Sequence, residues 1–349
     1  MPAIDNLNNI ERTAVDPMKK KLRKRRYRLS VLAAILLLGA IGASAQETKE
    51  TPAVTAGKAL KLSGYTQFSY EALDGGDNGF SIKRARLVLS GAILKNVRFK
   101  LQVDAMKSPI LLDANVELFL HEAATLCFGQ FKIPFGIEML TSSGDLDTIN
   151  RSQPVNNLSP GLDIGANGRD IGAVVFGKTS ILEYTVGLFN GAGINKADTN
   201  EEKDWAGRLA VHPTSFLTLG ASLYDGSYSP SISVPSEKRD RAGLDLAVLT
   251  GPVSLKGEYI RASDGTTLKE GWYLQGGYFF LPKKLQGIVK ADSYSWNTKE
   301  DLDRNSLWTL GANWFFAERT KLQVNLEITR DASGKTIHTA FLAQLQAGF

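Results

Sequence analysis

Cysteine and histidine are almost missing from this chain of 349 residues, which holds one cysteine, Cys127, and three histidines. A single cysteine excludes a disulfide-stapled secreted domain, a cysteine-rich metal site and Cys-x-x-Cys redox chemistry. His121, His212 and His338 are far apart and form no His-x-His or His-x-x-x-His pair for zinc, nor any grouping suited to hydrolysis. The sequence therefore predicts no metal site, no cofactor and no enzyme active site.

Long hydrophobic runs are also lacking, apart from one of about 13 residues from Leu29 to Ile41. That is shorter than the ~20 residues that a transmembrane helix needs. The run follows the basic stretch Lys19–Arg28 and precedes the small residues Ala43-Ser44-Ala45, an order typical of a secretory signal peptide. We predict cleavage after residue 45, with an uncleaved N-terminal anchor as the alternative.

The formal net charge of +5 belongs to this leader. Residues 1–45 hold nine Lys and Arg against three Asp and Glu, which leaves 32 basic and 33 acidic residues in the remainder. A nearly neutral mature chain gives no reason to expect a nucleic-acid partner. We predict an N-terminal extension and signal peptide over 1–45, a periplasmic spacer over 46–59 and a single domain over 60–349 in the bacterial outer membrane.

Helical periodicity is absent from residue 60 onward, where apolar and polar residues alternate in runs of 9–13 residues. In 322–329, for example, Leu322, Val324, Leu326 and Ile328 alternate with Gln323, Asn325, Glu327 and Thr329. Successive side chains of a strand point to opposite faces, so each run has one apolar and one polar face. A membrane barrel and a soluble β-sandwich both show this pattern.

Three further features favour the barrel. Short turns alternate with longer polar loops, which we predict at 72–79, 190–203, 226–237, 263–270 and 297–304. Aromatic residues such as Tyr65, Trp272 and Trp314 gather near strand ends, as in interfacial girdles. The final strand places Phe341 and Phe349 on one face. We predict an all-β, transmembrane antiparallel β-barrel of about 16 strands whose outer wall contacts outer-membrane lipid.

The longest connection, 134–168, is rich in proline, glycine, asparagine and serine and exceeds ordinary loop lengths. A barrel of sixteen strands encloses a lumen wide enough for an aqueous channel, which an inward fold of this connection would narrow. The charged residues of this predicted constriction loop are Glu138, Asp145, Asp147, Arg151 and Asp163, with a net charge of −3.

Three stretches resemble the phosphate-selective porin O and P family: Phe80-Ser-Ile-Lys-Arg-Ala-Arg-Leu87, Gly129-Gln-Phe-Lys-Ile-Pro-Phe-Gly136 and Gly168-Arg-Asp-Ile-Gly172. The resemblance extends over about residues 60–349. It implies a homotrimeric porin whose constriction is shaped by the loop after the second stretch. It also implies that the terminal aromatic residues Phe341 and Phe349 form an assembly signal for the barrel-assembly machinery.

Basic residues on the polar faces of the strands are predicted to line the pore. Arg84 and Arg86 share a face with Ile82 and Val88. Charge facing lipid near the membrane centre costs ~2–4 kcal/mol, so both arginines are expected in the lumen. The predicted basic lining is Arg84, Arg86, Arg98, Lys100, Lys132, Arg169, Arg208, Arg241 and Lys256, with Arg239 and Lys290 as further candidates.

An acidic loop facing these cations would produce a transverse electric field, and fixed cations favour anion entry. We therefore expect passive diffusion of small hydrophilic solutes with an anion bias, rather than strict phosphate selectivity. Neutralisation by carboxylates of neighbouring strands is the alternative, through Asp104, Asp113, Glu117, Asp170, Asp245, Glu258 and Asp292. A plugged or ligand-binding barrel (an adhesin or uptake component) and a soluble periplasmic sandwich also stay open.

One nucleotide-binding pattern is present but lacks its structural context. Residues 172–179 match the P-loop spacing, which requires a glycine-rich loop that leads into a helix. The middle of this segment and residues 181–189 are instead β-branched and aromatic. We predict a hairpin turn at Gly177–Ser180 and no nucleotide site.

Overall fold

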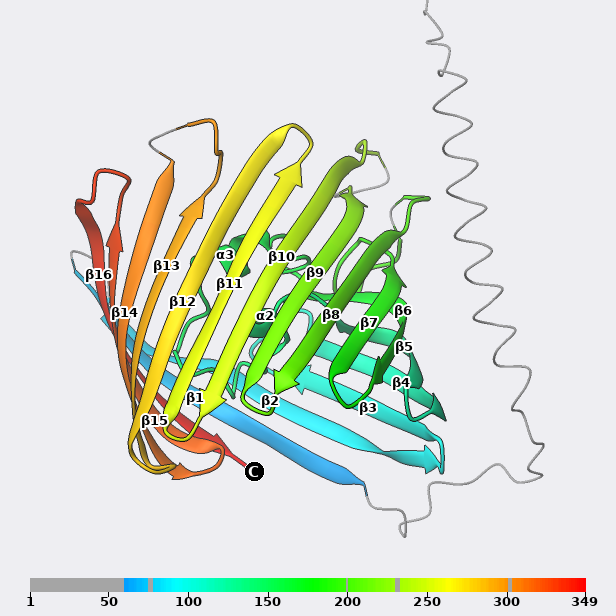
Figure 1. Ribbon diagram of the computed structural model, residues 1–349, viewed down its shortest axis with the longest axis horizontal. Helices are drawn as coiled ribbons and strands as arrows, with labels where there is room; N and C mark the ends of the chain where they lie inside the picture. The colour runs from blue at the N-terminus through cyan, green and yellow to red at the C-terminus, as the bar shows by residue number, and fades with distance from the viewer. Residues whose placement is uncertain (1–59, 75–77, 199, 230–232, 301–302) are drawn as a thin grey trace, which may run out of the picture. The chain divides into compact units, whose positions relative to one another are not determined.

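The computed structural model describes residues 60–74, 78–198, 200–229, 233–300 and 303–349, and the predicted leader and spacer lie outside them. Most of the described residues belong to one antiparallel sheet of sixteen strands (Figure 1). The first strand pairs with the last, which closes the sheet into a barrel. The predicted barrel and its strand number are confirmed, and a two-sheet sandwich is excluded.

The strands follow one another around the barrel in chain order. Their bounds are β1 Lys61–Leu73, β2 Asn78–Leu94, β3 Val97–Asp104, β4 Leu111–His121, β5 Ala124–Lys132, β6 Arg169–Lys178, β7 Leu182–Phe189, β8 Asp204–Thr214, β9 Leu217–Tyr228, β10 Glu237–Thr250, β11 Val253–Asp264, β12 Thr267–Leu281, β13 Leu285–Ser295, β14 Arg304–Ala317, β15 Thr320–Arg330 and β16 Thr336–Gly348. Two short helices, α2 (Ile137–Leu140) and α3 (Gln153–Leu158), lie between β5 and β6. No helix of the described residues has the length and hydropathy needed to span a membrane.

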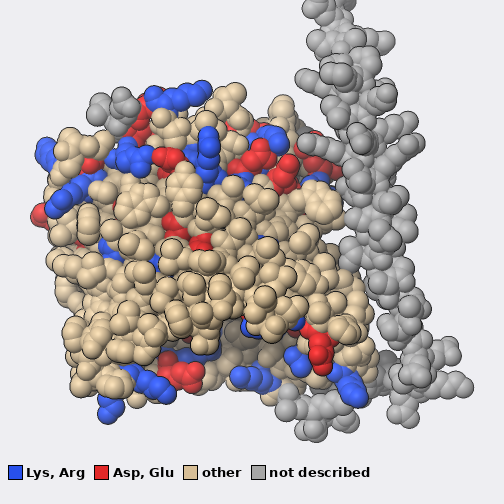
Figure 2. All heavy atoms as spheres, in the orientation of Figure 1, with Lys and Arg blue, Asp and Glu red and all other residues tan. Residues whose placement is uncertain are grey.

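The predicted alternation separates two chemically different faces of the wall. Leu223, Trp272 and Trp308 are exposed on the outer face, whereas inward positions carry polar residues such as Gln323 and Gln344 that are almost completely buried. Figure 2 shows charged side chains gathered toward the ends of the outer wall, with a mostly uncharged belt between them. An apolar belt around a polar interior is the arrangement of membrane barrels.

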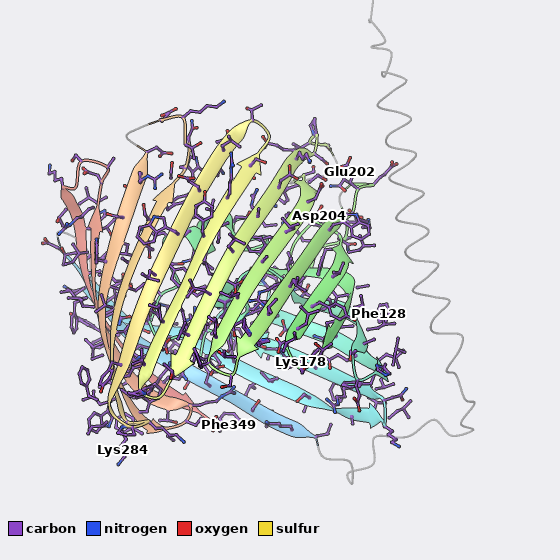
Figure 3. All side chains as sticks on the ribbon, viewed as in Figure 1. Phe128, Lys178, Glu202, Asp204, Lys284 and Phe349 are labelled. Atoms are coloured by element: carbon purple, nitrogen blue, oxygen red, sulfur yellow. The ribbon has the colours of Figure 1, made fainter. Side chains whose placement is uncertain are left out.

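The two ends of the barrel differ in the length of their connections. Lys178 and Lys284 flank short turns and lie toward the end that carries Phe349, whereas Glu202 and Asp204 lie at the opposite end (Figure 3). In outer-membrane barrels the short turns are periplasmic and the longer loops extracellular. The chain terminus Phe349 therefore lies at the periplasmic end.

One predicted loop is wrong. The segment 263–270 is not a long loop, because β11 and β12 continue until only Gly265 and Thr266 separate them. Gly265 has φ 54, the positive value that the first central residue of a type II′ hairpin turn requires. The loop dipeptide Gly265-Thr266, with glycine first, is the sequence signal that identifies this tight turn.

A β-bulge in β2 changes which of its residues face inward. Gln67 of β1 pairs with Arg84 and Phe68 pairs with Ile82, so Lys83 is an extra residue in β2. Because a bulge shifts the alternation by one residue, Ile82 points outward with 51% exposure. The prediction that Ile82 shares the face of the arginines is wrong, and Lys83 reaches the interior, where its Nζ donates to the carbonyl of Ile149 at 3.3 Å.

One of the predicted interfacial aromatics also faces inward. Tyr65 is buried, and its hydroxyl accepts a hydrogen bond from Nη1 of Arg86 at 3.0 Å. Trp272 and Trp314 are exposed on the outer wall, as predicted for a membrane interface. Phe341 and Phe349 are exposed there too, and their role as an assembly signal stays a prediction.

Candidate functional site

The connection between β5 and β6 lies inside the barrel (Figure 1). Its backbone and side chains bond to inward-facing side chains of β1, β2, β5 and every strand from β9 to β16. Representative partners are Gln67, Lys132, Ser222, Arg241, Glu258, Gln275, Lys290, Asn313, Gln323 and Gln346. We call residues 133–168 the constriction loop. It crosses the lumen from one wall to the other.

Apolar contacts fix the two helices of the constriction loop against one side of the lumen. Phe135, Val155 and Leu158 are completely buried, and they pack with Phe189 of β7 and Ile260 of β11 in one cluster. Burying an apolar side chain of this size stabilises the fold by about 1.5–3 kcal/mol. The loop is therefore an integral part of the barrel core.

The entry of the loop depends on one glycine and one buried carboxylate. Gly136 has φ 60, and a Cβ there would lie 2.2 Å from Oε2 of Glu258. Oε1 of Glu258 accepts the backbone N–H of Ile137 at 3.0 Å and the hydroxyl of Tyr273 at 3.0 Å. The final glycine of the Gly129–Gly136 motif is thus favoured by its positive φ and by the close approach of the Glu258 carboxylate. Glu258, predicted to neutralise a cation, instead binds the start of α2.

Substitution of Gly136 by alanine will loosen the constriction loop. The positive φ alone costs about 1–3 kcal/mol in a residue with a Cβ, and the contact with Glu258 adds to it. Gly165→Ala is the matched control, because Gly165 has φ 73 but no atom within 4 Å of its Cβ position. Urea unfolding in detergent will show a larger loss of stability for Gly136→Ala. Equal losses would mean that the contact with Glu258 does not constrain the loop.

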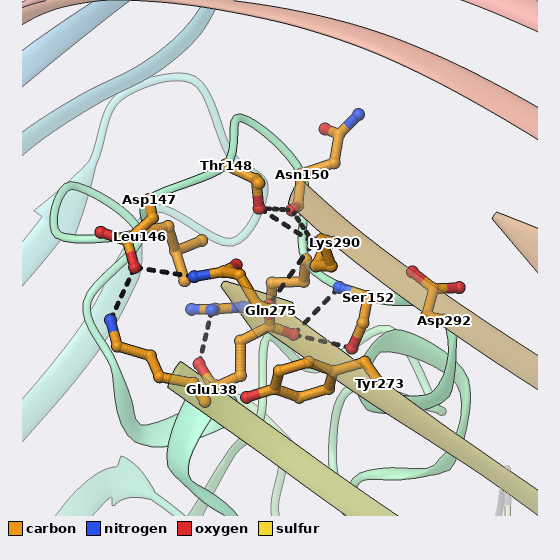
Figure 4. A network of polar contacts seen from close by, with 12 residues as sticks. Glu138, Leu146, Asp147, Thr148, Asn150, Ser152, Tyr273, Gln275, Lys290 and Asp292 are labelled. Atoms are coloured by element: carbon orange, nitrogen blue, oxygen red, sulfur yellow. Dashed lines mark hydrogen bonds and ion pairs between the residues drawn. The ribbon is translucent and has the colours of Figure 1, made fainter. Parts of the chain in front are cut away.

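Polar tethers hold the middle of the constriction loop against β13, β14 and β15, and Figure 4 shows those of Lys290 on β13. Nζ of Lys290 donates to Oγ1 of Thr148 at 2.8 Å and to the carbonyl of Asn150 at 2.9 Å. Nζ of Lys321 donates to the carbonyl of Leu146 at 2.7 Å. Both lysines are almost completely buried, so they serve the loop rather than the solute path.

The acidic residues of the loop do not face the predicted basic lining of β2 and β3. Asp147 pairs with Lys256 of β11 at 2.7 Å, and Asp163 pairs with Arg239 and Arg241 of β10. The remaining two acids pair more loosely, Glu138 with Lys290 and Asp145 with Arg319, both at 3.6 Å. Arg151 is the only cation of the loop, and it forms no ion pair with any described residue. The acids of the loop therefore form their ion pairs with cations of the wall between β10 and β15. The loop acids thus lie against Arg241 and Lys256 of the predicted lining, and not against its cations on β2 and β3.

Amide side chains on the inner face of the barrel, near the seam between β16 and β1, bond to one another. Gln67 donates to Gln346 at 2.7 Å, Gln344 to Gln323 at 3.0 Å, and Gln323 to Asn313 at 3.1 Å. All five side chains are at most 1% exposed. The loop covers the side chains of this amide ladder, so they are not accessible from the lumen.

The adjoining wall, formed by β2 to β5, and the loop beside it carry cations that have no carboxylate partner. Lys83, Arg84, Arg98, Lys132 and Arg151 form no ion pair within the described residues. Arg84 donates to Oε1 of Gln67 at 2.8 Å, Lys132 to three loop carbonyls, and Arg151 to the carbonyl of Glu138 at 2.6 Å, while Arg98 lies over the ring of Phe119. We call these five residues the unpaired cations.

Other predicted cations of this wall are neutralised. Nε of Arg86 pairs with Asp104 at 2.9 Å. Lys100 and Arg169 share Asp113, at 2.7 and 2.6 Å. The Lys100 side chain is still 42% exposed, whereas Arg169 is buried. Burial lowers the pKa of the loop residue Arg151 below its usual value, and the nearby Arg86 and Arg169 act in the same direction.

Three residues of the predicted lining lie apart from this group. Arg208 of β8 pairs with the buried Asp245 of β10 at 2.5 Å. Arg241 and Lys256 bind the loop acids Asp163 and Asp147. The structure thus brings six of the nine predicted cations to the β2–β6 wall and places these three in ion pairs on β8, β10 and β11.

Sequence reasoning missed the residues that hold the loop. Lys290, a candidate for the pore lining, and Lys321 instead bond to the loop from β13 and β15, and Gln67 and Gln346 bond to it from β1 and β16. The polar residues of the alternating runs already indicated that something bonds to them, because a buried amide that faces the lumen needs a hydrogen-bond partner. The partner itself lies in a loop more than a hundred residues away for most of them.

A closed sixteen-stranded barrel with an apolar outer belt, a polar interior and a long loop across its lumen is the architecture of a porin. The sequence model of the family described as phosphate-selective porin O and P matches residues 61–340. The chain therefore belongs to this family and is an outer-membrane channel protein.

Solved structures share the fold at low sequence identity. The anion-selective porin from Comamonas acidovorans matches with a TM-score of 0.65 and 16% identity, covering 84% of this chain and 100% of that one. OmpF of Salmonella typhi, in complex with daunomycin, gives 0.63 and 10%, covering 84% and 98%. The channel DcaP of Acinetobacter baumannii gives 0.61 and 12%, covering 85% and 99%. The comparison with curated proteins gave no match.

Proposed function

We propose that this porin is a passive, non-catalytic channel that favours small hydrophilic anions. In this proposal the chain is exported by a cleaved signal peptide, inserted by the barrel-assembly machinery and assembled as a homotrimer surrounded by outer-membrane lipid. OmpT of Vibrio cholerae, described in a trimer form, shares the fold and supports the homotrimer, and the anion-selective porin of Comamonas acidovorans shares it and supports the anion preference.

The observation that carries the proposal is the group of unpaired cations on the β2–β5 wall and on the loop beside it. Arg98 is exposed, and Lys83, Arg84, Lys132 and Arg151 are partly exposed. The only carboxylates beside them on β3 and β4 are Asp104, Asp113 and Glu117, two of which are already bound in ion pairs. Fixed charge of one sign in a confined aqueous path raises the local concentration of ions of the opposite sign.

Reversal potentials test the anion preference directly. The purified porin is inserted into planar bilayers under a KCl gradient, and the zero-current voltage is measured in 0.1 and 1 M salt. We expect the zero-current voltage to have the sign of an anion-selective pore. The preference for anions should be weaker in 1 M salt, because the Debye length falls from about 10 Å to 3 Å. A zero-current voltage with the sign of a cation-selective pore would refute the proposal, whatever the size of the conductance.

A plugged barrel is the second candidate, and the tethers of the loop favour it. The constriction loop bonds to eleven of the sixteen strands, which is more than is needed to narrow a lumen. A plugged barrel would insert into bilayers without conducting. Loop deletion, considered in the Discussion, separates the two functions.

A further inference from the structure

A groove crosses the outer wall where β7 to β11 approach the end with the long loops. Its cavity volume is about 620 Å³, and its lining is mainly apolar, with Val186, Trp205 and Leu223 among the lining residues. Gly207 and Ala242 pair with Leu223 from the two sides, so a tall side chain stands between two very small ones. Leu223 is consequently 68% exposed.

The fold does not require a glycine at the centre of this groove. Gly207 has no positive φ, and a Cβ there would meet only ordinary contacts, with the carbonyl of Thr185 and Cγ2 of Val186, both at 3.6 Å. A larger side chain would therefore fit and project outward. The small residue keeps the groove open.

Polar residues line the same groove beside the apolar ones. Lys238 pairs with Asp240 at 3.0 Å and more distantly with Asp225 at 3.8 Å. Arg261 lines the groove, is exposed and has no ion pair with any carboxylate of the described residues. The groove thus offers a free guanidinium and two carboxylates that share one ammonium.

We propose that this groove binds one phosphorylated glycolipid of the outer leaflet. An acyl chain lies over Gly207 and Ala242, the phosphate binds Arg261 and Lys238, and sugar hydroxyls donate to Asp225 and Asp240. The outer wall of a membrane barrel faces hydrocarbon, so an apolar groove in it is filled by lipid. A guanidinium recognises phosphate in a bidentate geometry, and carboxylates need donors, which a phosphorylated sugar supplies together.

Native mass spectrometry of the detergent-solubilised full chain, titrated with lipid A, tests this site. We expect one tightly held lipid A per barrel in the wild type and at least tenfold weaker binding in Gly207→Leu and in Arg261→Gln. Two matched controls keep wild-type affinity. Gly276→Leu adds the same side chain outside the groove, on β12, where nothing lies within 4 Å of the Cβ position, and Arg330→Gln removes an exposed arginine of β15 outside the groove.

Each alternative occupant gives a different result. Equal binding to all four variants would mean non-specific annular lipid, and equal affinity for dephosphorylated lipid A would remove the role of Arg261; either overturns the proposal. Dissociation of an oligomer by Gly207→Leu, with no lipid retained by the wild type, would assign the groove to a second copy of the chain. None of these outcomes bears on the anion preference, because the groove lies outside the lumen.

Discussion

Replacing residues 140–165 by a short glycine-serine linker will raise the single-channel conductance several-fold and abolish most of the ion selectivity. The constriction loop crosses the lumen, and a sixteen-stranded barrel without it encloses a wide aqueous channel. The two ends of the deletion are close, because Cε of Met139 lies 2.8 Å from the Cβ position of Gly168. Planar-bilayer recordings of the refolded barrel provide the measurement.

A surface loop supplies the control for this deletion. Shortening the hairpin loop 331–335, which lies at the rim between β15 and β16, removes residues without touching the lumen and should leave the conductance unchanged. A wild-type protein that inserts silently and conducts only after the loop deletion would establish the plugged barrel. An unchanged conductance would mean that the loop does not limit the current.

The second large effect is expected from removing three unpaired cations together, in the variant Arg84→Gln, Lys132→Gln, Arg151→Gln. None of the three binds a carboxylate, so no buried acid is left without a partner. A unit charge about 4 Å from a permeating ion is worth roughly 1 kcal/mol in water, which changes ion occupancy about fivefold. The anion-to-cation permeability ratio should approach that of free diffusion.

Net charge alone must be excluded as the cause of that loss. The variant Lys95→Gln, Arg304→Gln, Lys335→Gln removes the same formal charge from turns and from the outer wall. It should retain the wild-type reversal potential. If both triple variants behave alike, the selectivity comes from the overall potential of the barrel rather than from the β2–β5 wall.

The strands and the closure of the barrel were predictable because they depend on local pattern. Alternation such as Leu322, Gln323, Val324 assigns each residue to a face without knowledge of its neighbours. The bulge at Lys83 escaped this reasoning, since an extra residue in β2 is defined only by its pairing with Gln67 and Phe68 of β1. A one-residue shift of this kind moved Ile82 to the lipid face.

The partners of the charged residues were predictable only between adjacent strands. Asp104 and Asp113 neutralise Arg86 and Lys100, as expected from neighbouring positions on β2, β3 and β4. The acids of the constriction loop could not be assigned in this way. Their partners depend on where the loop crosses the lumen, which follows from the packing of Phe135 and Leu158 against the β7–β13 wall.

The first strand is joined to the last by backbone hydrogen bonds and, on the inner face, by the amide ladder, all of them uncharged groups. Glutamine and asparagine do not titrate, and hydrogen bonds between neutral amides are little affected by dissolved ions. Changes in acidity or salinity outside the cell should therefore alter which solutes pass this porin while leaving its circumference shut. Permeability depends on charged side chains and the closure of the barrel on uncharged groups, so a bacterium entering brackish or acid surroundings would keep the second while the first adjusts.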